Sequence, residues 1–218
     1  MSLILAIETS SSEYALALGR DGQAIFSSKD ATPAYPRDLS RVLSDALRDL
    51  KISAAEIDGI AVNVGPGGLG AIRAGVAFAN ALSFALCKPV LSRNFFELAG
   101  MQARRSSSSP VLIAVPGPGG SAFLGLFENG QVQQTKFGSL EKLAGELAGN
   151  RTELAVAGRL RGAVARILSN RTISDTQIDS PSPATLLENA AASFDQTELW
   201  TSQAIPLNEE AGLFHGQA

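Results

Sequence analysis

The order of short apolar segments is the same in the two halves of the chain, and this repeat constrains the fold more than any other feature. Each half opens with three segments that have the length of β-strands, followed by a predicted helix, another strand and another helix. Arg-Asp-Gly and Glu-Asn-Gly join the second and third segments as hairpin turns. The segments are Leu3–Ile7, Tyr14–Leu18, Ala24–Ser27, Val111–Val115, Ala122–Phe127 and Gln131–Lys136. The sequence therefore predicts a duplicated α/β unit with mixed sheets.

A polar, low-complexity segment separates the two halves. This segment, Arg104–Pro110, reads RRSSSSP and is typical of a linker. We therefore predict an N-terminal domain over residues 1–104 and a smaller second domain over residues 111–218. After Asp195 no strong periodicity is present, and we expect part of this tail to be disordered.

Composition and charge exclude several classes of function. The net charge is −3 with a pI near 5.3, which argues against a broad surface for nucleic-acid phosphates or anionic lipid. The only histidine is His215 and the only cysteine is Cys87, so the chain has no histidine pair for a metal and no internal disulfide. We expect Cys87 to be a small core residue. The N-terminal apolar run is too short for a signal peptide, so we expect a cytoplasmic protein.

The segment NVGPGGLGAIRAG, residues 63–75, lies between a predicted strand and a predicted helix. Gly65, Gly67 and Gly70 fit G-x-G-x-x-G, but Pro66 removes an N–H from the turn and no carboxylate ends the next strand. No Gly-Lys-Ser/Thr follows, which excludes a Walker A loop. Dinucleotide binding is therefore disfavoured.

A phosphate site of the actin and sugar-kinase type is a further alternative. There, Glu8 would organise a metal-bound water, while Thr9, Ser10 and the N–H groups of the loop would meet phosphate. The segment ETSSSE, residues 8–13, is equally interpretable as a polar turn with no ligand.

The predicted helix Leu69–Leu86 is almost wholly apolar or small. Its polar residues are Arg73, Asn80 and Ser83. A helix that is apolar all round needs cover on more than one side, so it is either sandwiched inside the fold or covered by another protein.

Several stretches in the first hundred residues together resemble the TsaB family, also called YeaZ. They are LAIETSSSEYALAL, RDLSRVL, IDGIAVNVGPGGLGAIRAGVAFANAL and KPVLSRNFFELA. The family pattern at the loop is Gly-Pro-Gly-Ser-Phe-Thr-Gly-Leu-Arg-Ile-Gly. Gly65, Pro66, Gly67, Arg73 and Gly75 keep the family residue, whereas Gly68, Leu69, Gly70 and Ala71 replace serine, phenylalanine, threonine and glycine.

This resemblance implies an ASKHA (actin, sugar kinase, Hsp70) fold with a reduced second domain. It also implies a non-catalytic subunit of the machinery that forms N6-threonylcarbamoyladenosine in tRNA. The implied partners are a TsaD-like catalytic subunit and a TsaE-like ATPase, with tRNA reached indirectly and a homodimer formed when the partner is missing. The implied interface lies on the helix after the loop, at Ala71, Ile72, Arg73, Gly75, Val76, Ala79, Leu82 and Ser83. A bulky charged residue at Gly75 or Ala79 is expected to abolish pairing without unfolding the protein.

Departures from the family pattern weaken any nucleotide site. Glu8 replaces the usual aspartate, and PGPGGS, residues 116–121, replaces a family segment of the second domain. We expect no required cofactor and no metal site, with ATP and Mg²⁺ possible only at a vestigial or partner-shared site made of Glu8, Thr9, Ser10, Gly65, Gly67 and Gly68.

Two alternatives remain open. One is an ATP-dependent small-molecule kinase on the same fold, which needs a catalytic carboxylate; Asp30 and Asp38 are the nearby candidates. The other is a degenerate paralogue that has kept the fold and lost the tRNA-modification role. A metal-dependent peptidase is the least favoured function, because the sequence lacks the metal ligands that its chemistry needs.

Overall fold

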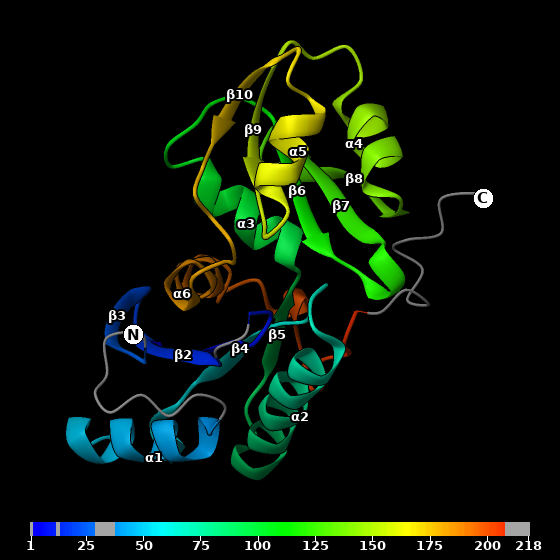
Figure 1. The fold of residues 1–218 in the computed structure, drawn as a ribbon. Helices are drawn as coiled ribbons and strands as arrows, with labels where there is room; N and C mark the ends of the chain where they lie inside the picture. The colour runs from blue at the N-terminus through cyan, green and yellow to red at the C-terminus, as the bar shows by residue number, and fades with distance from the viewer. Residues whose placement is uncertain (1, 12–13, 29–37, 208–218) are drawn as a thin grey trace. The chain divides into compact units, whose positions relative to one another are not determined.

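The chain divides into two units in the computed structural model, which describes residues 2–11, 14–28 and 38–207 (Figure 1). Unit 1 consists of Met1–Arg93 and Ser182–Pro206, and unit 2 of Asn94–Pro181 and Leu207–Ala218. Each unit contains one mixed sheet with helices packed on it. The predicted α/β class with duplicated mixed-sheet units is confirmed.

The sheet of unit 1 has the order β11-β5-β4-β1-β2-β3. Strand β1 lies antiparallel to β2, with Leu5 opposite Leu18, and parallel to β4, with Leu5 opposite Ile60. Asp21 and Gly22 have φ of 48° and 83°, which suits the predicted hairpin turn. The strands are β1 (Leu3–Glu8), β2 (Ala15–Arg20), β3 (Gln23–Ser27), β4 (Gly59–Asn63), β5 (Val90–Arg93) and β11 (Trp200–Thr201).

Several helices of unit 1 begin at polar side-chain caps. Helix α1 (Leu39–Leu50) begins after Asp38, whose side chain accepts from the N–H of Arg41, and it buries the apolar face formed by Leu39, Val42, Leu43 and Ala46. The short 3₁₀ helix η1 (Ala54–Glu56) has a capping box formed by Ser53 and Glu56. Helix α2 has the predicted bounds, Leu69–Leu86, and α6 spans Pro183–Ala192.

The sheet of unit 2 has the order β10-β9-β6-β7-β8. Strand β6 lies antiparallel to β7 and parallel to β9, as β1 lies to β2 and β4. Asn129 and Gly130 form the predicted turn, with φ of 55° and 82°. The elements are β6 (Val111–Pro116), η2 (Pro118–Gly120), β7 (Ala122–Glu128), β8 (Gln131–Gly138), α4 (Leu140–Ala148), β9 (Glu153–Ala157), α5 (Arg161–Ile167) and β10 (Thr172–Asp175).

The last helix of each repeat belongs to the other unit. Helix α3 (Phe95–Ala103) follows β5 in sequence, but Phe95 and Phe96 lie in the core of unit 2 with Phe127. Gly125 on β7 makes room for the ring of Phe96, because a Cβ there would lie 2.5 Å from it. Helix α6 follows β10 in sequence and packs on β1 of unit 1. The chain thus divides before α3 and before α6, and the predicted linker lies inside unit 2.

One local prediction needs correction, and two short strands were not predicted. Cys87 is exposed, because it ends α2 in the left-handed conformation with φ of 54°. Residues after Asp195 form η3 (Thr197–Leu199) and β11, a strand that was not predicted and that pairs with β5. The tail after Leu207 lies outside the described residues. Strand β10 was not predicted, since its four residues are mostly exposed and carry no apolar run.

Candidate functional site

The carboxyl ends of β1 and β4 lie side by side in unit 1. The two strands are parallel and Ile7 is opposite Val62, so Glu8 and Asn63 follow at the same edge of the sheet. In open α/β sheets, ligands bind at this edge, outside the carboxyl ends of the strands. The predicted residues Glu8, Thr9, Ser10, Gly65, Gly67 and Gly68 all belong to the two segments that leave these strands.

The Glu8 carboxylate is buried, and both of its oxygens accept hydrogen bonds from neighbouring residues. One oxygen accepts from the backbone N–H of Ser10 at 2.7 Å and from its hydroxyl at 2.5 Å. The other accepts from the side-chain amide of Asn63 at 2.7 Å. Only 1% of Glu8 is exposed. The carboxylate therefore ties the turn after β1 to the end of β4.

Asn63 extends this network into the glycine loop. Its amide oxygen accepts from the N–H of Gly65 at 2.9 Å, and the residue is fully buried. Sequence reasoning did not select Asn63 as a site residue. The signal was present, because a polar residue that ends an otherwise apolar strand needs a buried partner.

Thr9 is buried behind the network, against helix α2. Its hydroxyl has no hydrogen-bond partner in the described structure. A Cβ at Gly75 would lie 2.2 Å from that hydroxyl oxygen, so Gly75 is what allows α2 to approach β1. Thr9 thus acts as a packing residue.

The loop itself closes onto the turn after β1. A Cβ at Gly67 would lie 3.1 Å from the carbonyl oxygen of Ser10, which places the two backbones in near contact. Gly65 is buried, Gly67 is half-buried, and Gly68 precedes α2 as a cap without a side-chain hydrogen bond. The N–H groups of the first turn of α2 have the chemistry to attract an anion.

The residues present do not fit a bound Mg²⁺–nucleotide. Both oxygens of Glu8 already accept hydrogen bonds from protein donors, and the side chain is closed to solvent. Among the described residues, no three His, Cys, Asp or Glu side chains gather as metal ligands. The side chains at this edge of the sheet are therefore arranged to hold the fold together.

The kinase candidates are also poorly suited to act as a general base. Asp38 is exposed and caps α1. Hydrogen bonds from the N–H of Arg41 and the hydroxyl of Ser40 hold the pKa of Asp38 below its usual value, so this carboxylate is a weaker base than a free one. Asp30 lies outside the described residues.

Helix α2 carries its predicted interface residues on two different faces. Ile72, Gly75, Val76, Ala79 and Ser83 are buried within unit 1. Arg73 is exposed, and Ala71 and Leu82 are half-buried. The buried residues face the sheet because Gly75 lies against Thr9, so the expectation that a large side chain at Gly75 or Ala79 would leave the fold intact is corrected.

The opposite side of α2 is apolar and exposed, and we call it the outer face of α2. Phe84 is 89% exposed and Leu69 is 45% exposed. The helix is long and apolar enough to cross a membrane by length and composition, and only 28% of it is buried. The outer face consists of Leu69, Gly70, Arg73, Ala74, Ala77, Ala81, Phe84 and Ala85.

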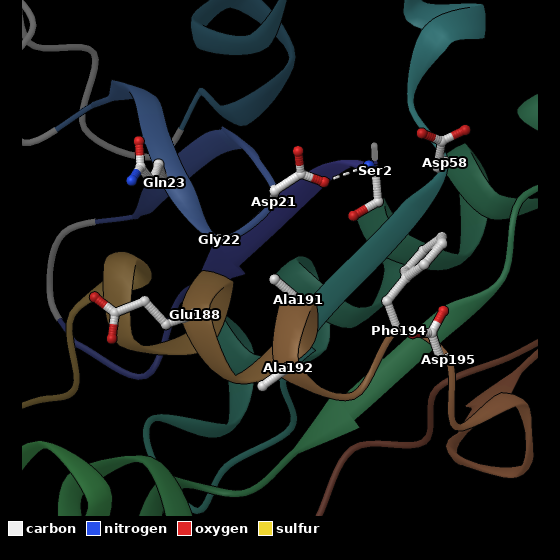
Figure 2. Close-up of a pocket in the computed structure, with 10 residues that line it drawn as sticks. All are labelled: Ser2, Asp21, Gly22, Gln23, Asp58, Glu188, Ala191, Ala192, Phe194 and Asp195. Atoms are coloured by element: carbon white, nitrogen blue, oxygen red, sulfur yellow. Dashed lines mark hydrogen bonds between the residues drawn. The ribbon is translucent and has the colours of Figure 1, made fainter.

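A hollow of about 840 Å³ lies at the opposite ends of the same strands, where β1 and β4 begin (Figure 2). Ser2 and Asp58 precede β1 and β4, whereas Glu8 and Asn63 end them. Asp21 accepts from the N–H of Ser2 at 2.8 Å, and Asp58 accepts from the N–H of Leu3 at 2.9 Å. These carboxylates therefore hold the start of β1, and the hollow is separate from the predicted site.

The chain resembles known proteins in sequence. Residues 28–196 match the family model of TsaD, tRNA N6-adenosine threonylcarbamoyltransferase. A tRNA N6-adenosine threonylcarbamoyltransferase of Geotalea uraniireducens is 32% identical over 163 residues, which cover 66% of this chain and 47% of the relative. The match thus spans less than half the length of these curated relatives, between 30% and 47%.

Among solved structures, YeaZ from Pseudomonas aeruginosa superposes with a TM-score of 0.74 at 21% identity, over 95% of this chain and 100% of that one. A ROK family protein from Streptococcus pneumoniae, solved with sucrose, superposes with a TM-score of 0.51 at 11% identity, over 91% of this chain and 100% of that one. The fold along nearly the whole chain is therefore that of YeaZ, which is of the ASKHA type.

Proposed function

This chain belongs to the family of TsaD, tRNA N6-adenosine threonylcarbamoyltransferase, and on that premise we propose that it is a non-catalytic subunit of the machinery that forms N6-threonylcarbamoyladenosine in tRNA. In this proposal it binds a TsaD-like catalytic subunit, as a YeaZ-type (TsaB) protein, and reaches tRNA only through that complex. A TsaE-like ATPase joins the same assembly. The location is the cytoplasm, and no cofactor is required.

The non-catalytic role is supported by the closed site at the ends of β1 and β4. Glu8 is buried and has its oxygens occupied by Ser10 and Asn63. Thr9 is pressed against Gly75, and Gly67 against Ser10. A catalytic acid or base must reach the reacting group, and these side chains do not reach solvent.

The proposal of partner binding rests on one observation, the exposed apolar outer face of α2. Phe84 is 89% exposed, and Arg73 is the only charged residue along the helix. Large exposed apolar patches mark interaction sites, and alanines along a helix let a second helix approach closely. The occupant in this proposal is a helix of the TsaD-like subunit. A second copy of the chain covers the same face when that subunit is missing.

Co-purification with the TsaD-like protein of the same organism tests the proposal. We expect Phe84→Glu to abolish the complex, because a carboxylate at the centre of an apolar contact loses its hydration. Ile25→Glu is the matched control, since Ile25 is a large apolar residue, 38% exposed, on β3 of the same unit. A complex that survives Phe84→Glu unchanged would overturn the assigned interface.

The proposal is also tested by calorimetry with ATP and Mg²⁺. We expect that no ATP binding depends on the Glu8 carboxylate, so the titration of Glu8→Gln should match that of the parent protein. Tight binding with phosphoryl transfer to a hydroxyl acceptor would instead favour the small-molecule kinase. Failure to pair with any TsaD-like protein, together with no ATP binding, would favour a degenerate paralogue.

A further inference from the structure

A second hollow, of about 620 Å³, lies in unit 2 at the turns that precede β9 and β10. It is lined by Gly149–Thr152, which follow α4, and by Ser169–Thr172, which follow α5. Both segments are polar, and neither takes part in the site described above. The hollow is lined by two arginines and by no acidic residue.

The two segments have the same tripeptide and the same local geometry. Asn-Arg-Thr occurs at 150–152 and again at 170–172. The N–H of Arg151 donates to the carbonyl of Ala148 at 3.1 Å, and the N–H of Arg171 donates to the carbonyl of Leu168 at 3.0 Å. The N–H of Thr172 donates to the carbonyl of Thr152 at 2.9 Å, which fixes the turns side by side.

The two arginines differ in how their charge is balanced. Arg151 is paired with Glu128, whose carboxylate accepts from Nη2 at 2.7 Å and from Nε at 3.4 Å. The Nη1 of Arg171 donates to the carbonyl of Arg151 at 2.7 Å, and its Nη2 donates to the carbonyl of Gly149 at 2.8 Å. Within the described ranges, no carboxylate lies within ion-pair distance of Arg171. Its charge is therefore held in place by carbonyls and is not neutralised.

Further donors surround this guanidinium. The hydroxyls of Thr152, Ser169 and Thr172 have no protein partner in the part of the chain that the structure describes, and neither have the side-chain amides of Asn150 and Asn170. A guanidinium has more N–H donors than two carbonyls use, so Arg171 also retains N–H groups for a ligand. A fixed positive charge among unused hydroxyls and amides is suited to an oxyanion with several acceptor oxygens.

We propose that this hollow binds a phosphate group, carried either by a small phosphorylated molecule or by a nucleic-acid backbone. Arg171 supplies the uncompensated charge, and the hydroxyl and amide side chains of the two Asn-Arg-Thr turns supply further hydrogen bonds. This site does not depend on the function proposed above, because it lies in unit 2 and uses none of the residues of α2.

The competing interpretation is that Arg171 only fastens the chain after α4. Its two carbonyl partners, Gly149 and Arg151, do follow the end of that helix. Under that interpretation, a charge added elsewhere in the hollow would not change phosphate binding. A variant that adds a charge and leaves the Arg171 bonds in place therefore separates the two interpretations.

The test is titration of the full chain with inorganic phosphate and, separately, with a single-stranded RNA oligonucleotide. Asn150→Asp removes no protein contact and adds a carboxylate to the hollow, so we expect phosphate binding about tenfold weaker than in the parent protein. Arg171→Gln is expected to weaken it at least as much. Gln134→Glu is the matched control, because it adds the same charge on exposed β8, at the opposite edge of the sheet from β10.

The outcomes are separable. Phosphate binding that Asn150→Asp weakens and Gln134→Glu does not supports a site for a small phosphorylated molecule. RNA binding with the same variant pattern, without binding of free phosphate, supports the backbone source. If neither probe binds the parent protein, or if Asn150→Asp binds both as the parent does, the proposal is overturned. An unchanged thermal unfolding of Asn150→Asp excludes loss of fold as the cause.

Discussion

The two units share a topology but fill the ends of corresponding strands differently. Glu8 ends β1 opposite Ala15, and Pro116 ends β6 opposite Ala122, so the two residues occupy the same register position. In unit 1 this position begins a buried polar network that reaches Asn63 and Gly65. In unit 2 it is an exposed proline that leads into η2. One topology thus supports a site-like network in one copy and a simple turn in the other.

The helix between the fourth and fifth strands of each unit also differs between the two units. In unit 1 this is α2, with 18 residues and an exposed apolar face; in unit 2 it is α5, with 7 residues and arginines at both ends. Gly75 of α2 lies against Thr9, whereas Gly162 of α5 has open space around it. A duplicated fold can therefore specialise one copy through the residues at its strand ends and the length of one helix.

The largest effect is expected from Glu8→Ala, which breaks the network of unit 1. It leaves the amide of Asn63 and the N–H of Ser10 buried without an acceptor, and should lower the free energy of unfolding by about 3 kcal/mol. Pro116→Ala, at the same position of unit 2, should change it by less than about 1 kcal/mol. Urea unfolding followed by circular dichroism measures both variants, and the fluorescence of Trp200, the only tryptophan, reports on unit 1 separately. A loss for Glu8→Ala no larger than the small change expected for Pro116→Ala would show that the network does not stabilise the fold.

An intermediate effect is expected from Gly75→Ala. The new Cβ would lie 2.2 Å from the Thr9 hydroxyl, so Thr9 or α2 must shift, at a cost of about 2 kcal/mol. Gly162→Ala in α5 meets no atom within 4 Å and should stabilise the protein by about 0.5 kcal/mol, because alanine favours helix more than glycine does.

Combining Gly75→Ala with Thr9→Ala provides the control. The double variant should recover part of the lost stability, measured as the urea midpoint, since the clash with the hydroxyl is removed. Strictly additive losses would rule out the contact between Thr9 and Gly75 as the cause.

The smallest effect concerns the ion pair that holds the turn before β9. Arg151 holds the pKa of Glu128 below its usual value, through a hydrogen bond and then its charge. A carboxyl group whose pKa is lower in the folded state contributes stability above its unfolded pKa and loses it as the pH falls through the folded pKa. Glu128→Gln should therefore cost about 1 kcal/mol or less near pH 7, because both partners are partly exposed.

The same substitution should cost less in acid, once the pH falls below 4.5, the ordinary pKa of a glutamate side chain, and the parent carboxylate becomes protonated. Circular dichroism of urea unfolding at neutral and acidic pH measures the difference between parent and variant. A difference that grows as the pH falls would contradict the assigned sign.

The candidate site was predicted in part because its residues follow strands directly. Strand ends are local in sequence, so Glu8, Thr9, Ser10 and the glycines were found from the pattern alone. Their burial and hydrogen bonding were not predicted. Both depend on Asn63 and Gly75, which contact these residues only through the β1–β4 pairing and the packing of α2. Five of the eight predicted interface residues are buried within unit 1, which was not foreseen, since an apolar helix does not reveal from its own sequence which face meets the sheet.

The sequence by itself determined the order of three strands, a helix, a strand and a helix in each half, the two hairpin turns and the bounds of α2. These features depend on turn residues and periodicity over a few neighbouring positions. The tertiary structure decided that α3 and α6 belong to opposite units, that β11 completes a sheet by pairing with β5, and that Cys87 is exposed. Those outcomes depend on contacts between residues far apart in the chain, such as Asn80, whose side chain exchanges two hydrogen bonds with the backbone of Ala204. Such contacts carry no local pattern from which they could be predicted.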